Sequence, residues 1–255
     1  MTPLATGLEL AGVSRHFAGV HAVREVSLRV EPGQVVGLVG PNGSGKTTLA
    51  NVASGALAPS EGAVGVDGTD LTGARAPRFA AAGVVRTFQD LRLFERMSVL
   101  DNVVVGAQRA ERLSLLAAWR RSARFRRRER ELHDRARAAL ADVGLAAFAD
   151  RPVGALSHGQ RRRVEVARAF ATDASYLVLD EPGAGVDPDE LLRLADLIGA
   201  RRDAGAGILL VDHDTGLLER LADRVVGMAD GRIVAEGPYA TVAAHPSLRH
   251  QLAVG

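Results

Sequence analysis

Residues 40–47 of the chain read Gly-Pro-Asn-Gly-Ser-Gly-Lys-Thr. This stretch fits the pattern G-x-x-x-x-G-K-[ST] at every fixed position. The almost wholly apolar run before it, residues 35–39, predicts a strand buried on both faces, and residues 46–49 read as a helix start. In a strand–loop–helix of this kind, backbone N–H groups and the positive end of the helix point at phosphate oxygens. The loop therefore predicts a nucleotide site in which Lys46 reaches the β- and γ-phosphates and the Thr47 hydroxyl binds Mg²⁺.

Lys46 is the only lysine in the chain, which otherwise uses arginine for positive charge. The planar guanidinium of arginine cannot replace a compact ammonium on a flexible stem. The placement of the one lysine inside a glycine-rich loop favours a functional role. The alternative is a surface lysine in an ordinary strand-to-helix turn.

The composition is that of a globular protein without disulfides. Hydrophobic residues make up 47% of the chain and charged residues 24%, and there is no cysteine. The first residues lack the features of a signal peptide, and no stretch approaches the roughly 20 apolar residues that cross a bilayer. A net charge of +2 does not demand a nucleic-acid partner. We therefore expect a cytoplasmic protein whose membrane role depends on partners.

A second motif, Leu-Val-Leu-Asp-Glu at residues 177–181, ends an apolar run with two adjacent carboxylates. Open α/β sheets bind ligands at the carboxyl ends of their strands. We expect Asp180 to hold Mg²⁺ and Glu181 to polarise an attacking water. Alone, the pattern also fits any buried strand that ends in an acidic turn; beside the phosphate loop it predicts hydrolysis.

The remaining pattern indicates an α/β core with a helical insertion. A mainly helical pattern covers about residues 100–171, with Gly144 placed as a helix stop. Apolar or alternating runs bounded by turn residues predict strands on both sides of it. We expect these strands at residues 26–30, 35–39, 176–179, 208–211, 224–228 and 232–236, the last two forming a hairpin.

A third motif, Leu-Ser-His-Gly-Gln at residues 156–160, precedes a helix predicted to run to about Ala171. Ser157 and Gln160 have the spacing of a capping box, which is a purely structural reading. A capped helix N-terminus beside an exposed glycine is also an anion site, so the two readings are compatible.

With these three motifs in this order and spacing, the chain resembles the ABC ATPase family from about residue 8 to residue 237. The resemblance implies an α/β fold: a P-loop NTPase core of ABC ATPase type with an antiparallel β subdomain and an inserted helical subdomain. It implies one domain over residues 5–240, with the helical subdomain at about 95–172, and a C-terminal tail at 241–255.

The resemblance also implies a set of site residues. ATP and Mg²⁺ are the expected ligands, and Phe17 is placed to stack on adenine, although a single phenylalanine is also commonly a core residue. The expected nucleotide-binding residues are Phe17, Gly40, Pro41, Asn42, Gly43, Ser44, Gly45, Lys46, Thr47 and Thr48; the expected metal ligands are Thr47, Gln89 and Asp180; and the expected catalytic residues are Glu181, Gln89 and His213.

In this family two cassettes pair head to tail, so each ATP lies between the loop of one copy and the 156–160 motif of the other. Ser157, His158, Gly159 and Gln160 would thus act in trans, and Asp187 resembles the aspartate of the D-loop. The commonest form of the motif has glycine at the position of His158. If Ser157 and the Gly159 backbone contact phosphate, a side chain at 158 can point away with little loss.

The expected cargo follows from a narrower resemblance. Residues 83–89, 93–94, 98–102 and 181–188, and the insert after Gln108, look like the branch that serves branched-chain amino acid importers, although residues 245–255 lack its ending. A sister branch that extracts lipopolysaccharide shares some of these segments. The resemblance implies integral membrane permease subunits, a homodimer or heterodimer of cassettes, an extracytoplasmic substrate-binding protein, no nucleic acid, and a peripheral place on the cytoplasmic face of the inner membrane.

Two alternatives stay open. Soluble ABC ATPases act on DNA or ribosomes, but those carry long coiled coils or two cassettes, which this chain lacks. The arginine-dense run at residues 119–130 is either a solvated helix or loop with interleaved acids or a surface that contacts anionic lipid headgroups or a partner loop.

Overall fold

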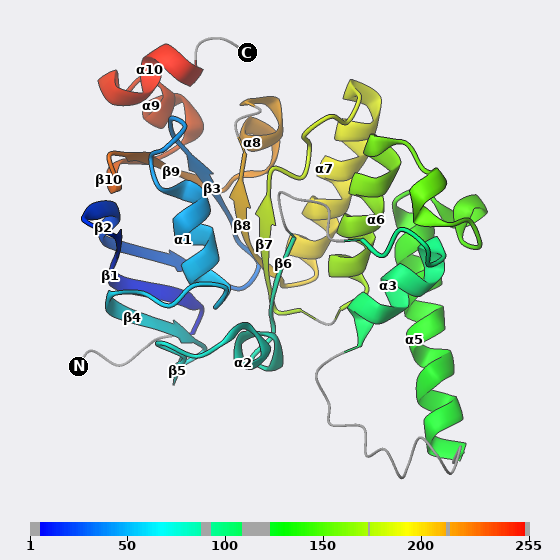
Figure 1. Ribbon diagram of the computed structural model, residues 1–255. Helices are drawn as coiled ribbons and strands as arrows, with labels where there is room; N and C mark the ends of the chain where they lie inside the picture. Colours follow the sequence, from blue (N-terminus) through cyan, green and yellow to red (C-terminus); the bar gives the residue numbers. More distant parts are fainter. Residues whose placement is uncertain (1–5, 88–92, 109–122, 173, 213–214, 253–255) are drawn as a thin grey trace. The chain divides into compact units, whose positions relative to one another are not determined.

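A computed structural model describes residues 6–87, 93–108, 123–172, 174–212 and 215–252 (Figure 1). The chain divides into two compact units. The first contains residues 1–89, 175–184 and 188–255, and the second contains residues 90–174 and 185–187.

The first unit is built on a six-stranded sheet in the order β10-β9-β3-β8-β7-β6. Every residue of β3, β7 and β8 is buried, which is the environment that a continuous apolar run predicts. The pairs β9–β3, β3–β8, β8–β7 and β7–β6 are parallel, and β9–β10 is an antiparallel hairpin. The strands are β3 (Val35–Val39), β6 (Val84–Arg86), β7 (Tyr176–Asp180), β8 (Gly207–Val211), β9 (Arg224–Ala229) and β10 (Arg232–Gly237).

A second, antiparallel sheet in the same unit has the order β2-β1-β4-β5. Its strands are β1 (Leu8–Phe17), β2 (Val20–Val30), β4 (Glu61–Val66) and β5 (Thr69–Asp70). Tyr176 connects the two sheets, because its hydroxyl donates a 2.6 Å hydrogen bond from β7 to the Asp67 carboxylate in the turn between β4 and β5.

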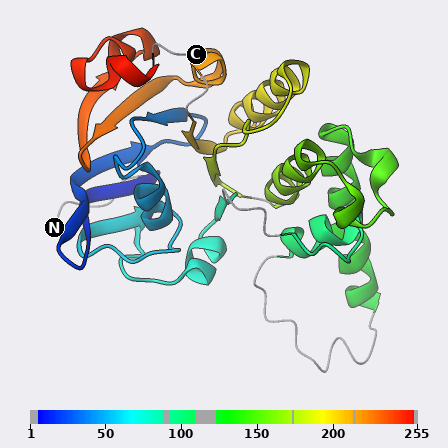
Figure 2. The same ribbon diagram turned by 45° about the horizontal axis from the view of Figure 1, so that its top comes forward.

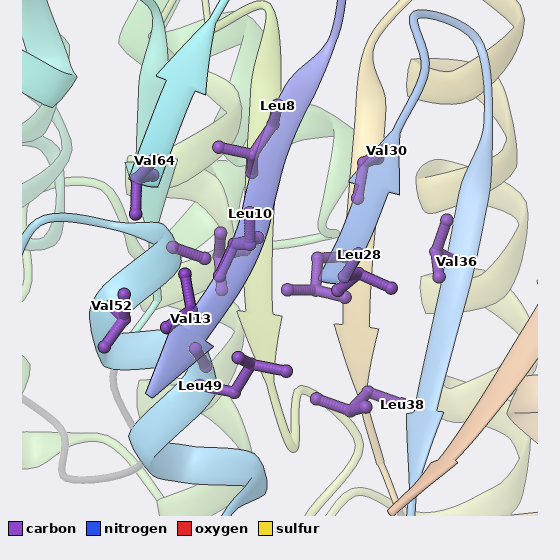
Figure 3. Close-up of a cluster of buried hydrophobic side chains, with 14 of the residues drawn as sticks. Leu8, Leu10, Val13, Leu28, Val30, Val36, Leu38, Leu49, Val52 and Val64 are labelled. Atoms are coloured by element: carbon purple, nitrogen blue, oxygen red, sulfur yellow. The ribbon is translucent and has the colours of Figure 1, made fainter. Parts of the chain in front are cut away.

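Helix α1 (Lys46–Ala53) lies against strands of both sheets and contacts β1, β2, β7 and β8. Its buried side chains, Leu49, Ala50, Val52 and Ala53, join one apolar cluster with both sheets. Figure 3 shows how aliphatic side chains from β1, β2, β3, β4 and α1 converge in this cluster. The helix that follows the glycine-rich loop is therefore fixed by the core of the unit.

Further helices complete the first unit. They are α2 (Ala76–Ala81), α7 (Pro188–Asp203), α8 (Thr215–Leu221), α9 (Tyr239–Ala243) and α10 (Pro246–Leu252). The last two pack on β9 (Figure 2). Val242 of α9 and Leu248 of α10 are fully buried. The packing is close enough that a Cβ on Gly227 would lie 2.3 Å from Leu248 Cδ1.

The second unit is helical. Its helices are α3 (Val99–Ala107), α5 (Ala123–Asp142) and α6 (His158–Phe170), with 3₁₀ turns at Ala146–Phe148 and Val153–Ala155. The three helices pack on one another, and a Cβ on Gly106 of α3 would lie 2.9 Å from Arg168 Cβ of α6. Gly144 adopts φ 69° just after α5, so the predicted helix stop is confirmed. Among the residues described, no helix combines the length and the apolar character needed to cross a membrane.

Candidate functional site

The glycine-rich loop, residues 40–47, connects β3 to α1. Gly40, Gly43 and Gly45 all have positive φ angles, of 151°, 81° and 101°, in a region that favours glycine. A Cβ on Gly40 or Gly45 would lie 2.2 Å from a backbone carbonyl oxygen, that of Met228 or Ala22. A Cβ on Gly43 would meet no described atom within 4 Å, so the loop is packed on one side and open on the other.

The Lys46 amine lies inside the curve of the loop. Its Nζ donates hydrogen bonds to the carbonyl oxygens of Gly40, at 2.6 Å, and Pro41, at 3.0 Å. Burial lowers the pKa of Lys46 below its ordinary value, and the negative charges of Glu181 and then Asp180 act in the opposite direction. The loop cation and the two predicted hydrolytic carboxylates therefore lie close enough to interact electrostatically.

The sheet register accounts for this proximity. Leu38 of β3 pairs with Val211 of β8, and Val211 pairs with Asp180 of β7, so the three strands end at the same level of the sheet. The backbone N–H of Glu181 donates to the Val211 carbonyl at 2.7 Å. Glu181 itself has φ 48°, a left-handed conformation that is uncommon for a non-glycine residue and turns the chain sharply at the strand end.

Asp180 is almost fully buried, with 1% of its side chain exposed, and it contacts Arg86 of β6 and Thr87, the residue after that strand. Arg86 Nη2 lies 2.7 Å from Asp180 Oδ2, and Arg86 Nη1 hydrogen-bonds to Asn51 Oδ1 of α1. The backbone N–H of Asp180 donates to the Thr87 hydroxyl at 3.2 Å. The predicted metal ligand is thus held by an arginine and a threonine that the motifs did not identify.

Phe17 stands at the end of β1, where it pairs with Val20 across the β1–β2 hairpin. It is 43% exposed, so the alternative that it is a core residue is wrong. The guanidinium carbon of Arg15 lies 4.6 Å from the centroid of its ring, a cation–π contact that orients the ring. Because the Ala22 carbonyl of the same hairpin abuts Gly45, the aromatic ring stands on the strand pair that borders the loop.

The 156–160 motif begins helix α6 in the second unit. The Ser157 hydroxyl accepts from the Gln160 N–H at 3.2 Å, and the Gln160 side chain accepts from the Ser157 N–H at 3.0 Å. The predicted capping box is confirmed. Ser157 and His158 are exposed, whereas Gly159 and Gln160 are half-buried.

The His158 ring turns toward the loop that contains the predicted D-loop aspartate. A Cβ on Gly185 would lie 3.3 Å from His158 Nδ1, and Asp187, two residues further on, is exposed. The side chain that departs from the commonest motif therefore packs on residues of its own unit.

Other predicted residues divide into two groups. In the loop, Asn42 and Thr47 are exposed, Ser44 is buried, and Pro41 and Thr48 are half-buried. Gln89 and His213, together with residues 119–122 of the arginine-dense run, lie outside the described residues. The rest of that run begins α5, where Arg127 pairs with Glu131 at 2.9 Å on an exposed face, as expected of a solvated helix with interleaved acids.

The loop fits a bound nucleotide. The Ser44 hydroxyl is buried and has no hydrogen-bond partner among the residues that the structure describes, so it has capacity for a ligand. The first N–H groups of α1 have no partner within the helix, and the open side at Gly43 leaves them room for an anion. Thr47 and Asp180 offer the hard oxygen donors that Mg²⁺ prefers.

Comparison with known proteins identifies the family to which the chain belongs. Residues 23–184 match the model of the family described as ABC transporter. The chain belongs to this family. It is 38% identical over 242 residues to the high-affinity branched-chain amino acid transport ATP-binding protein BraF of Pseudomonas aeruginosa, covering 94% of this chain and 95% of BraF.

Further members of the ABC transporter family agree with this assignment. The chain is 36% identical to the high-affinity branched-chain amino acid transport ATP-binding protein LivG of Escherichia coli K12, over 94% of this chain and 95% of LivG. Among solved structures, the ADP conformation of the ATP-binding cassette MJ1267 of an ABC transporter matches with a TM-score of 0.82 and 30% identity, covering 99% of this chain and 100% of that one.

The family membership confirms the predicted fold class and the predicted biochemical class. The chain is an ABC ATPase, the nucleotide-binding subunit of a transporter. Arg86, Asn51 and Arg15 were missed by the sequence reasoning. An arginine directly after the apolar residues 84–85 was the one available signal, but its partner could not be identified without the strand register.

Proposed function

We propose that this ABC ATPase hydrolyses Mg-ATP at the 40–47 loop and drives the import of branched-chain or related amino acids through separate permease subunits. The main support for the hydrolytic site is that β3, β8 and β7 end at the same level of the sheet. This arrangement brings Lys46 close enough to Glu181 and Asp180 to interact with them electrostatically. An ATPase site needs these opposite charges together, one for the phosphates and the other for metal and water.

The loop residues bind the triphosphate in this proposal. The N–H groups of residues 40–48 surround the phosphates, Lys46 exchanges its bonds to the Gly40 and Pro41 carbonyls for phosphate oxygens, and the Phe17 ring stacks on adenine. Thr47, Asp180 and Gln89 would hold Mg²⁺, which supplies charge neutralisation at the β- and γ-phosphates.

Glu181 accepts the proton of the attacking water. The water oxygen bonds to the γ-phosphorus, the bond from that phosphorus to the β,γ-bridging oxygen breaks, and ADP and inorganic phosphate leave. Lys46 and His213 stabilise the charge on the γ-phosphoryl group, and no covalent enzyme intermediate is needed. The left-handed backbone at Glu181 supports this role, because strained conformations are common at active sites.

The second half of the site comes from a second cassette, either another copy of this chain or a related subunit. Its Ser157 and Gly159 face the γ-phosphate, with His158 and Gln160 shaping the helix terminus and Asp187 contributing from the D-loop. The exposed Ser157 at the positive end of a 13-residue helix supports this assignment.

The cargo is proposed from the relatives. Both BraF and LivG are named as branched-chain amino acid transport ATP-binding proteins, and the alignments cover nearly all of each chain. The complete complex would contain permease subunits and an extracytoplasmic substrate-binding protein, with this chain peripheral on the cytoplasmic face of the inner membrane.

Reconstitution of the chain with its co-purifying membrane subunits in proteoliposomes tests the proposal. We expect ATP-dependent uptake of radiolabelled leucine, isoleucine or valine that Glu181→Gln abolishes. Co-purification with a lipopolysaccharide-extracting permease would redirect the cargo, and co-purification with ribosomes or DNA would remove the transport role. If the wild-type complex neither binds nor hydrolyses ATP, the whole proposal is overturned.

A further inference from the structure

Arg86 is buried between two elements that each carry part of the proposed site. Only 5% of its side chain is exposed. Its Nη2 lies 2.7 Å from Asp180 Oδ2, and only 1% of the Asp180 side chain is exposed. Its other guanidinium nitrogen bonds to Asn51 of α1, the helix that begins at Lys46. One planar group therefore connects β6, the end of β7 and the loop helix.

A buried ion pair of this kind needs an explanation. Removing two charges from water is costly, and similar apolar packing is often as stable, so such pairs are weak evidence of a purely structural role. Here the core around α1 is built mainly from aliphatic side chains, and the charged pair lies at its edge, where β7 ends in the Asp180-Glu181 pair.

The arrangement also separates two possible partners of Asp180. The Lys46 amine donates to the Gly40 and Pro41 carbonyls, whereas the Asp180 carboxylate accepts from Arg86. With Arg86 as its counter-ion, Asp180 is oriented without using the Lys46 amine, which remains in the loop for phosphate.

We propose that Arg86 is a positioning residue that orients the Asp180 carboxylate toward Mg²⁺ and ties it to the loop helix through Asn51. This inference rests on the proposed function of the site. Partners that orient metal ligands matter: their loss typically costs about 10–100-fold in metal affinity. The planar fork is required, because its two edges bond to a carboxylate and an amide at once.

The test measures the Mg²⁺ dependence of nucleotide binding rather than turnover. A fluorescent ADP analogue is titrated into the full chain in EDTA and then with increasing Mg²⁺. For Arg86→Met we expect the half-saturating Mg²⁺ concentration to rise by about tenfold or more, with nucleotide affinity in EDTA unchanged within about twofold. Arg86→Lys should restore only part of the effect, since an ammonium cannot span both partners.

Arg162→Met is the matched control. Arg162 and Glu165 form another buried pair, at 3.0 Å, within α6 of the second unit. Its loss should lower the melting temperature without moving the Mg²⁺ dependence. In a double-mutant cycle, Arg86→Met should add little once Asp180→Asn is present, because both changes remove one interaction.

Asn51→Ala provides a second route if Arg86→Met does not fold, with a smaller rise in the Mg²⁺ requirement expected. An unchanged Mg²⁺ dependence in folded Arg86→Met would overturn the inference. If Arg86→Met does not fold, an unchanged Mg²⁺ dependence in Asn51→Ala would do the same. Fully additive effects of Arg86→Met and Asp180→Asn on the Mg²⁺ dependence would also overturn it. Wild-type protein that binds no nucleotide would instead overturn the proposed function, so the two failures are distinguishable.

Discussion

Lys46 Nζ lies 2.6 Å from the carbonyl oxygen of Gly40, the first residue of the loop that Lys46 closes. The amine therefore bonds back across the loop to a backbone dipole. A triphosphate in the same place would offer it full negative charges, and hydrogen bonds between charged groups are the stronger kind.

Replacing Lys46 should weaken nucleotide binding itself. We expect Lys46→Ala to lower Mg-ATP affinity by about 10–100-fold, because a hydrogen bond to a charged group contributes about 1.5–3 kcal/mol. Isothermal titration calorimetry measures the change. Lys46→Arg should not restore affinity, since the planar fork does not fit the space of an ammonium. An unaltered dissociation constant in Lys46→Ala would count against the phosphate-loop assignment.

Glu181→Gln should separate binding from chemistry. Loss of a general base lowers turnover by about 10²–10⁴-fold, whereas the neutral amide keeps the size and the backbone conformation of the residue. ATP affinity should stay within a few-fold of wild type, and phosphate release should fall. Wild-type turnover would remove Glu181 from its proposed role.

Two loop glycines give a matched pair of variants. Gly45→Ala would bring a Cβ to 2.2 Å from the Ala22 carbonyl oxygen, whereas Gly43→Ala projects into open space. Both incur the left-handed strain of about 1–2 kcal/mol, but only Gly45→Ala adds a backbone clash. We expect Gly45→Ala to lower the free energy of unfolding further and Gly43→Ala to lose mainly nucleotide affinity. Equal losses of stability in urea denaturation would contradict the assigned packing.

Two helix caps separate the structural role of Ser157 from its proposed role in ATP hydrolysis. Ser157 caps α6 and Ser98 caps α3, each accepting from the N–H three residues later. Ser157→Ala and Ser98→Ala should each lower stability by about 1 kcal/mol. Only Ser157→Ala should also slow ATP hydrolysis by the assembled complex. A Ser98→Ala variant as slow as Ser157→Ala would reduce the motif to plain capping.

Tyr176 should make stability fall at alkaline pH. Burial, followed by the hydrogen bond to Asp67, raises the pKa of Tyr176 above its ordinary value. Above about pH 10 the unfolded chain loses this proton while the folded chain keeps it, so the free energy of unfolding decreases as pH rises. Tyr176→Phe should flatten this decline, measured by urea midpoints at about pH 9 to 11. The chain's other tyrosine provides the control, because Tyr239→Phe should retain the decline.

Much of the site could be predicted because its determinants are local in sequence. Each expected strand is present, and the runs at 35–39, 176–179 and 208–211 are fully buried strands, which read as continuous apolar segments. The loop, the two carboxylates and the capping box depend on neighbours within a few residues. Local spacing was sufficient for these features.

The features that were missed depend on long-range pairing. Strand β1 was not predicted, since register shifts after Leu10, Val13 and Arg15 interrupt its alternation. Arg86 meets Asp180, 94 residues away, only because β6 and β7 pair in parallel with Arg86 opposite Val178. No pattern in the sequence specifies that pairing.

The position of α1 between two sheets has a thermodynamic consequence. Leu49, Ala50, Val52 and Ala53 anchor the helix in the hydrophobic core, so the curvature of the preceding loop is set during folding. A ligand that arrives at a preorganised cradle loses little affinity to ordering the protein. More of its binding free energy then remains for drawing two cassettes together, the step on which mechanical work in a transporter depends.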